Sequence, residues 1–262
     1  MFDSVIVCPW KDGQQQDGVQ NGAHAIAYFV KKFFDFSRYV CIHNNKNYTN
    51  EKYHSVVYEE ARTMPGSKLL VGGDHSVAIG SVLSSIHNDN DTCVIWIDAH
   101  ADINTIDSST SKNLHGMPLS FICGTENAWK WTHPLKKLGF NNLFYFGVRD
   151  IDEYELNILK KEKIKRLSNI NEISGLLSLY NTMHVSFDVD ALDPKDMHST
   201  GTRSDQGVPL DEIIDLFSIL SLAQSNGKTI HVDICEYNPL IGNTAQKETS
   251  WKSLENILCT LC

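Results

Sequence analysis

The sequence predicts an α/β fold of three layers, in which helices cover both faces of a central, mostly parallel sheet of about eight strands. Short apolar runs alternate with longer segments of helical periodicity, a pattern typical of βαβ units. The runs are too uniformly apolar for a sheet with one solvated face. With 262 residues, 42% of them hydrophobic, the chain is expected to form one domain over residues 1–262.

The expected elements alternate along the chain. Runs rich in Val, Ile and aromatic residues predict strands at SVIVC (4–8), YVCI (39–42), KLLVGG (68–73), CVIWID (93–98), NLFYFGV (142–148), HVSFDVD (184–190) and IHVDICE (230–236). Between them, helical periodicity predicts helices near 22–35, 76–87, 152–162, 170–179, 210–225 and 245–258. Open parallel sheets bind ligands beyond the carboxyl ends of their strands, so chemistry is expected there.

Charge and composition argue against several classes of partner. The 32 acidic and 23 basic residues give a formal charge of -9, which disfavours nucleic acid and anionic membranes and is compatible with bound cations. The N-terminal MFDSVIVCPW lacks the features of a signal peptide, and no run of about 18 apolar residues occurs. Seven scattered cysteines, an odd number, indicate free thiols. We therefore expect a soluble cytoplasmic protein.

Polar side chains follow four of the predicted strands. They are Asp74 and His75; Asp98, His100 and Asp102; Asp188 and Asp190; and Glu236. In an extended segment, residues two apart point the same way, so the members of each alternating group are expected to converge. A single acid at a strand end is usually a cap or turn residue, but several such groups at one edge of a sheet indicate a site.

The composition of this set predicts a metal centre. Carboxylates gathered at the buried edge of a sheet repel one another unless cations neutralise them, and two divalent ions would balance four aspartates. Oxygen and imidazole ligands without thiolates suit Mn²⁺ and, less specifically, Co²⁺, Fe²⁺ or Zn²⁺. The predicted ligands are His75, Asp98, His100, Asp102, Asp188 and Asp190.

Six motifs occur in the order found in a known family. They are GGDHS (72–76), DAHADIN (98–104), NLHGMPLSF (113–121), SFDVDALDP (186–194), STGT (199–202) and ICEYNP (234–239). Together they resemble the ureohydrolases, and within these the arginase rather than the agmatinase branch. The resemblance implies an α/β/α fold, two Mn²⁺ per subunit, hydrolysis of L-arginine to L-ornithine and urea, and a homo-oligomer, either trimer or hexamer.

The resemblance also implies how the ligands divide between the two ions. One ion would be held by His75, Asp98, Asp102 and Asp188, and the other by His100, Asp98, Asp188 and Asp190. Asp98 and Asp188 would bridge the pair. Two metals so placed share a water and deliver it as a bridging hydroxide at neutral pH.

Catalytic roles follow from the same resemblance. Glu236 would pair with the guanidinium of the substrate. Asp102 would accept the proton of the hydroxide and pass it on as the tetrahedral intermediate collapses. His115 would carry a proton between bulk water and the leaving amine, and Thr202 would line the pocket near the guanidinium and the metals.

Substrate choice is expected to depend on a second group of residues. By the resemblance, Asn104 and Ser111 bind the α-carboxylate of arginine and Asp152 attracts its α-ammonium, while Asp150 and Glu155 support the ammonium directly or through water. Agmatine lacks the carboxylate, so such a site discriminates against it. Two alternatives stay open: hydrolysis of another guanidino compound, such as agmatine or guanidinobutyrate, and a catalytically silent homologue with a regulatory role.

One segment departs from the family pattern. After STGT the family usually continues with a proline and a glycine-rich turn, whereas this chain continues with Arg203 and reaches Gly207 through Ser, Asp and Gln. Loss of the proline frees the backbone and adds a cation. The change is expected to affect the loop beside Thr202 but not the metal ligands.

Overall fold

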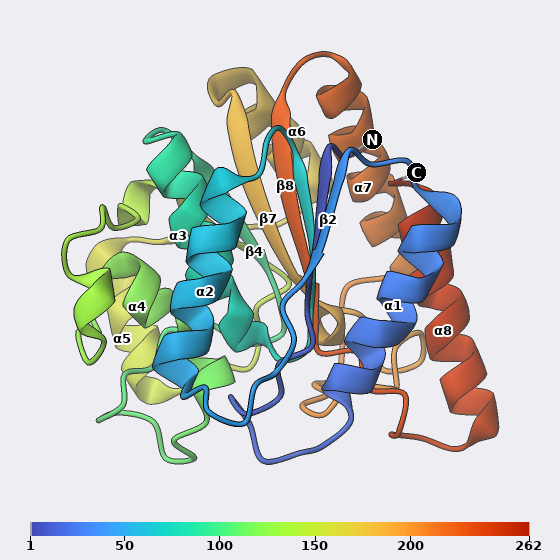
Figure 1. Cartoon of the computed structure of the whole chain (residues 1–262), viewed down its shortest axis with the longest axis horizontal. Helices are drawn as coiled ribbons and strands as arrows, with labels where there is room; N and C mark the ends of the chain where they lie inside the picture. The colour runs from blue at the N-terminus through green and yellow to red at the C-terminus, as the bar shows by residue number, and fades with distance from the viewer. Residues whose placement is uncertain (1, 262) are drawn as a thin grey trace.

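The central sheet has eight strands in the computed structural model, which describes residues 2–261 (Figure 1). Met1 and Cys262, which belong to the predicted domain, lie outside the described residues. Across the sheet the order is β2-β1-β3-β8-β7-β4-β5-β6, and all neighbouring strands among these residues are parallel. The strands are β1 (Ser4–Cys8), β2 (Arg38–Cys41), β3 (Lys68–Gly72), β4 (Cys93–Ile97), β5 (Leu143–Phe146), β6 (Lys165–Leu167), β7 (Thr182–Asp188) and β8 (Thr229–Cys235).

Helices cover both faces of this sheet, which confirms the predicted three-layer fold. They are α1 (Val19–Phe33), α2 (Asn50–Thr63), α3 (Ala78–Asn88), α4 (Pro118–Cys123), α5 (Glu153–Glu162), α6 (Ile170–Leu179), α7 (Leu210–Ser225) and α8 (Thr244–Cys259). In Figure 1, α2, α3, α4 and α5 lie on one side of the sheet, and α1, α7 and α8 lie on the other. Helices α1 and α8 run side by side there, with Phe29 and Trp251 in ring contact.

Alternate side chains of each central strand pack against the helices on opposite faces of the sheet. Along β4, Cys93, Ile95 and Ile97 pack into the core formed with α1, α6, α7 and α8. Val94 and Trp96 of the same strand point into the core formed with α3, α4 and α5. The whole strand is therefore buried, as the uniformly apolar run predicts.

The sequence does not predict three of these elements, β6, α4 and α2. Strand β6 has only three residues, two of them exposed, too short for a periodicity to show. Helix α4 has six residues between two turns. In α2 the buried positions, Tyr53, Val57 and Ala61 with His54 and Tyr58, have helical spacing, but aromatic rings and an imidazole replace the usual aliphatic side chains.

None of the helices within residues 2–261 has the length and apolar character needed to cross a membrane.

Candidate functional site

The order of the central strands explains why the predicted residues meet. Strands β3, β8, β7 and β4 are consecutive in the sheet although they are far apart in the sequence. Because all are parallel, His75, Glu236, Asp188 and Asp98 follow or end these strands at one edge. The sheet thus gathers the four polar groups that the sequence places at strand ends.

His75 lies at the centre of the first cluster of candidate ligands. Its Nδ1 atom is 3.1 Å from Asp98 Oδ2, 3.2 Å from Asp102 Oδ2 and 3.4 Å from Asp188 Oδ2. The other ring nitrogen, Nε2, is 2.8 Å from Ser186 Oγ. The imidazole is fully buried and stacks on the indole of Trp96, with ring centroids 4.1 Å apart.

His100 forms the second cluster with two acids. Its Nδ1 atom is 3.3 Å from Asp98 Oδ1 and 3.2 Å from Asp190 Oδ2. Asp98 therefore turns one oxygen to each imidazole, Oδ2 to His75 and Oδ1 to His100. This is the arrangement of a carboxylate that bridges two ions.

Convergence is achieved by turns rather than by extended strands, which corrects one step of the sequence argument. Strand β4 ends at Ile97, before Asp98, and Asp102 has a left-handed backbone with φ of 50°. Asp190 lies in a short 3-10 turn after β7. The side chains meet as predicted, but the chain folds back to bring them together.

The charges of these groups fit bound cations. Burial, and then the neighbouring Asp98, raise the pKa of Asp102 to about 8. Burial and the neighbouring Asp190 raise the pKa of Asp188 well above its usual range. Asp98 is also buried, but the two imidazoles outweigh burial and lower its pKa. The cluster thus retains protons that divalent ions would displace.

The spacing of the donor atoms fits metal ions as well. Ligand atoms that bind one ion at about 2.1 Å, roughly at right angles to one another, are about 3 Å apart. The ligand atoms of His75, Asp98 and Asp188 lie within 4.8 Å of one another, as do those of Asp98, His100 and Asp190, and the distances from the imidazole Nδ1 atoms are 3.1 to 3.4 Å.

Glu236 lies beside the first cluster in a strained backbone conformation, with φ of 70°. Its Oε1 atom accepts hydrogen bonds from the backbone N–H of His75, at 2.9 Å, and from His115 Nδ1, at 3.0 Å. Burial opposes the charge on His115, but the Glu236 carboxylate outweighs it and raises the pKa of His115 to about 9. The two residues form an ion pair in which His115 lines the cavity and Glu236 is buried behind it.

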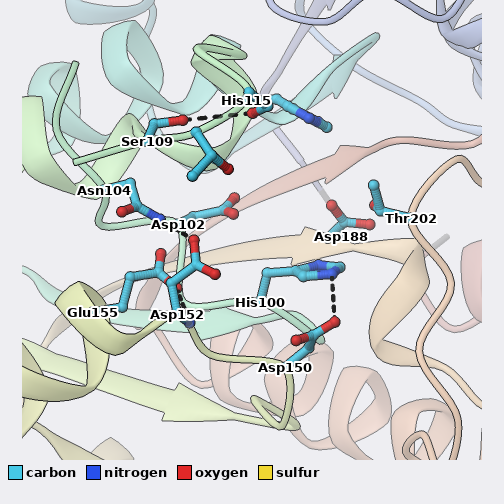
Figure 2. A pocket seen from close by; sticks show the side chains of 13 residues that line it. His100, Asp102, Asn104, Ser109, His115, Asp150, Asp152, Glu155, Asp188 and Thr202 are labelled. Atoms are coloured by element: carbon cyan, nitrogen blue, oxygen red, sulfur yellow. Dashed lines mark hydrogen bonds and ion pairs between the residues drawn. The ribbon is translucent and has the colours of Figure 1, made fainter. Parts of the chain in front are cut away.

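A cavity of about 180 Å³ opens onto both clusters. Figure 2 shows Asn104, Asp152 and Glu155 on one side of it, Thr202 and Asp188 on the other, and Asp102 between them. Ser111 and His115 also line the cavity. It therefore joins the predicted metal ligands to the residues expected to bind the substrate.

Known proteins resemble this chain over nearly its whole length. A family model described as the Arginase family matches residues 4–261. The chain belongs to the arginase family.

Individual members show the same relationship. An arginase of Schizosaccharomyces pombe is 37% identical over 207 residues, which cover 72% of this chain and 62% of that protein. An arginase of Coccidioides immitis is 31% identical over 94% of this chain and 89% of its own length. The structure is similar to that of Entamoeba histolytica arginase in complex with L-ornithine, with a TM-score of 0.83, 25% identity and 98% of each chain covered.

Hydrogen bonds link several of the residues that are expected to bind the amino-acid end of an arginase substrate. Asn104 Nδ2 donates to Asp152 Oδ2 at 2.9 Å, and Asn104 Oδ1 accepts from Ser108 Oγ at 2.9 Å. The second N–H of the Asn104 amide is available to a ligand. Ser111 Oγ accepts a hydrogen bond from the backbone N–H of Asn113 at 3.2 Å.

Two of the predicted substrate residues already have partners in the fold. Glu155 accepts hydrogen bonds from the backbone N–H groups of Ile103, at 3.1 Å, and Asp152, at 3.0 Å. It therefore joins the start of α5 to the loop of Asn104, and burial raises its pKa to about 7. Asp150 is exposed, lines the cavity and lies 3.8 Å from Nε2 of His100, a predicted metal ligand.

Arg203, which departs from the arginase pattern, makes hydrogen bonds within the loop that carries it. Its Nη1 atom donates to the carbonyl oxygens of His198, at 2.9 Å, and Thr200, at 2.8 Å. Thr202 Oγ1 donates to Asp190 Oδ2 at 2.8 Å, so the loop reaches the second cluster. The arginine thus provides hydrogen bonds where the family has a proline.

Three residues near the site are missed by the sequence analysis. Gln14 Nε2 donates to Glu236 Oε2 at 2.6 Å, but it lies in a glutamine run that resembles a low-complexity tract. Trp96 Nε1 donates to Asp98 Oδ2 at 3.0 Å. Ser186 shares a face of β7 with Asp188, two residues on, so alternation alone could have found it.

Proposed function

We propose that this protein hydrolyses L-arginine to L-ornithine and urea in a site that holds two Mn²⁺ ions. The observation that carries the proposal is the Asp98 carboxylate, which turns one oxygen to each imidazole cluster at a cavity lined by Asn104 and Ser111. Relatives named arginase support the reaction, and the similar Entamoeba histolytica structure contains L-ornithine.

In this proposal the two clusters are the metal ligands. His75, Asp98, Asp102 and Asp188 would hold one ion, and His100, Asp98, Asp188 and Asp190 the other. The ions would supply an activated water as the nucleophile at neutral pH. Buried carboxylates and imidazoles without thiolates suit Mn²⁺.

The protein's own residues orient the substrate and move protons. The Glu236 carboxylate pairs with the guanidinium and holds its carbon near the clusters. An Asp102 oxygen takes one proton of the water that adds to that carbon, and passes it to the leaving nitrogen as the C–N bond breaks. His115 has Nδ1 on Glu236, so its Nε2 is free to deliver a proton to the leaving amine of ornithine.

Discrimination between guanidino compounds would come from the amino-acid end of the cavity. The free N–H of Asn104 and the Ser111 hydroxyl are placed to bind an α-carboxylate, and Asp152 an α-ammonium. Agmatine lacks the carboxylate and guanidinobutyrate lacks the ammonium. Arginine satisfies both groups, which favours it over either compound.

Replacing Asn104 tests this choice of substrate. We expect Asn104→Ala to lower kcat/KM for arginine about tenfold and to change kcat/KM for agmatine little, because only arginine uses the amide. Asn127→Ala, at an exposed asparagine, is the control. If the parent protein hydrolysed agmatine or guanidinobutyrate faster than arginine, that compound would be the better candidate substrate. If it hydrolysed none of the three, a catalytically silent homologue would be favoured.

The assembly state and the compartment are also part of the proposal. The family resemblance supports a homotrimer or hexamer, and the sequence features set out above support a cytoplasmic location. Light scattering on the purified protein tests the first, with a mass of one subunit contradicting it.

A further inference from the structure

The loop from Trp10 to Gly18 lies behind the site, beside His115 and Glu236, and is held by its backbone at several points. The backbone N–H of Gly13 donates to Asp74 Oδ2 at 2.8 Å, and the carbonyl of Gly13 accepts from the backbone N–H of His115 at 3.1 Å. Farther along, the carbonyl of Asp17 accepts from Asn238 Nδ2 at 2.9 Å. The loop therefore has a fixed place that does not depend on its glutamine side chains.

From this anchored loop, one side chain reaches the carboxylate that we assign to the guanidinium. Gln14 is half-buried, and its Nε2 donates to Glu236 Oε2 at 2.6 Å across 222 residues of sequence. The side-chain oxygens of Gln14 and Gln16 both lie near Gly201, at 3.6 Å and 2.9 Å from where a Cβ there would stand. The amide of Gln14 therefore lies between the Glu236 carboxylate and the loop that carries Thr202.

The hydrogen bonds on Glu236 leave it one acceptor position. A carboxylate accepts about four hydrogen bonds, two on each oxygen. Oε1 already accepts from the His75 backbone and from His115, and Oε2 accepts from Gln14. One acceptor position on Oε2 is left. Because the Gln14 amide occupies the other position on Oε2, it fixes the direction in which the remaining lone pair points.

We propose that Gln14 is a positioning residue: its amide fixes Glu236 so that the open position on Oε2 faces the guanidinium of the substrate. The inference rests on the proposed function only for the role of Glu236. Because Gln14 acts at the guanidinium end, it serves every guanidino substrate alike, in contrast to Asn104.

The test compares Gln14→Ala with Gln15→Ala, a change at the exposed neighbour in the same loop. On Mn²⁺-loaded protein we would measure kcat/KM for arginine and agmatine, the dissociation constant of guanidinium chloride by calorimetry, metal content and Tm. A hydrogen bond to a charged group changes an equilibrium constant about tenfold or more, and we take this as the scale of the effect on a carboxylate that loses its orientation. We therefore expect kcat/KM for both substrates to fall about tenfold with their ratio unchanged, and guanidinium to bind about tenfold more weakly.

The same loss should occur without a change in metal content and with only a small fall in Tm, because one hydrogen bond of the fold is removed while the backbone anchors of the loop remain. Gln14→Asn, whose side chain is one methylene shorter, should behave like Gln14→Ala. Gln14→Glu should lose more, because it places a carboxylate against Glu236.

Values equal to those of Gln15→Ala would overturn the inference, and so would a loss confined to arginine. Guanidinium binding separates this inference from the proposed function. If the parent protein turned over neither substrate but bound guanidinium more tightly than Gln14→Ala does, the role of Gln14 would be supported and the proposed hydrolysis of arginine would be refuted.

Discussion

Both imidazoles of the proposed metal site have partners at both ring nitrogens. His75 has the acids at Nδ1 and Ser186 at Nε2, and His100 has Asp98 and Asp190 at Nδ1 with Asp150 3.8 Å from Nε2. A partner on the outer nitrogen fixes the tautomer and the orientation of a ligating ring. Ser186 is therefore expected to support the metal site although it is not a ligand.

Replacing Ser186 tests this support. We expect Ser186→Ala to weaken Mn²⁺ binding about tenfold, because the imidazole of His75 loses its 2.8 Å partner. Titration of metal-free protein with Mn²⁺ against a competing chelator measures the loss. Ser218→Ala, which removes a hydroxyl from α7 far from the sheet edge, is the control. Equal affinities in the two variants would show that Ser186 does not hold the ring.

At the scale of elements, the missed helix α2 is docked by a buried histidine. His54 Nδ1 donates to the carbonyl of Asn50 at 2.6 Å, and His54 Nε2 is 2.9 Å from Ser76 Oγ, next to His75. Burial lowers the pKa of His54 from 6.5 to about 4. The helix that escaped the sequence analysis thus packs behind the residues that begin the first cluster.

Because the pKa of His54 is lowered in the folded state, we expect the free energy of unfolding to include a contribution that is lost in mild acid. Between pH 6.5 and about 4 only the unfolded chain binds this proton, so stability is present above pH 6.5 and is lost as the pH falls. The loss is about 1.4 kcal/mol per pH unit and about 3 kcal/mol at most. Relative to the parent protein, we expect His54→Gln to lower the slope of the free energy of unfolding against pH by up to about 1.4 kcal/mol per unit between pH 6.5 and about 4, measured in urea with chelator present.

The exposed His24 supplies the control, since His24→Gln should keep the slope of the parent protein. If His54→Gln retained that slope as well, His54 would not be the neutral buried group described here.

The sequence predicts what depends on local pattern and misses what depends on distant contacts. Alternation found seven of the eight strands and the polar groups at their ends, because burial and turns leave a periodic signature. The contact of Gln14 with Glu236 joins residues 222 apart and has no such signature. The sequence predicts Glu155 as a substrate residue, and it stays a prediction because Glu155 lines the cavity; a single sequence does not reveal that its carboxylate also accepts two backbone N–H groups.

At the scale of the whole molecule, the order of the strands concentrates negative charge at one edge of the sheet. Asp98, Asp102, Asp188 and Asp190 are all buried there. Buried acids that hold protons or repel one another make the metal-free fold less stable than the metal-bound one. Metal should therefore be part of the stability of the protein as well as of its chemistry.

Metal removal tests this link. At a free Mn²⁺ concentration one hundred times the dissociation constant, binding stabilises the folded state by about 2.7 kcal/mol. For a chain of this size we expect Tm to rise by about 5 to 10 °C when stripped protein is reloaded. Asp98→Asn should largely remove the rise, because Asp98 serves both clusters. A Tm indifferent to Mn²⁺ in the parent protein would contradict a metal centre built from these acids.

The most direct test of the central claim is urea release by protein stripped of metal and then reloaded with Mn²⁺, with L-arginine and agmatine as parallel substrates. We predict urea from arginine only after reloading, about two ions bound per chain, and little urea from agmatine. Urea release by the stripped protein, or no release from either substrate with two ions bound, would contradict the claim that this site hydrolyses arginine with a pair of metals.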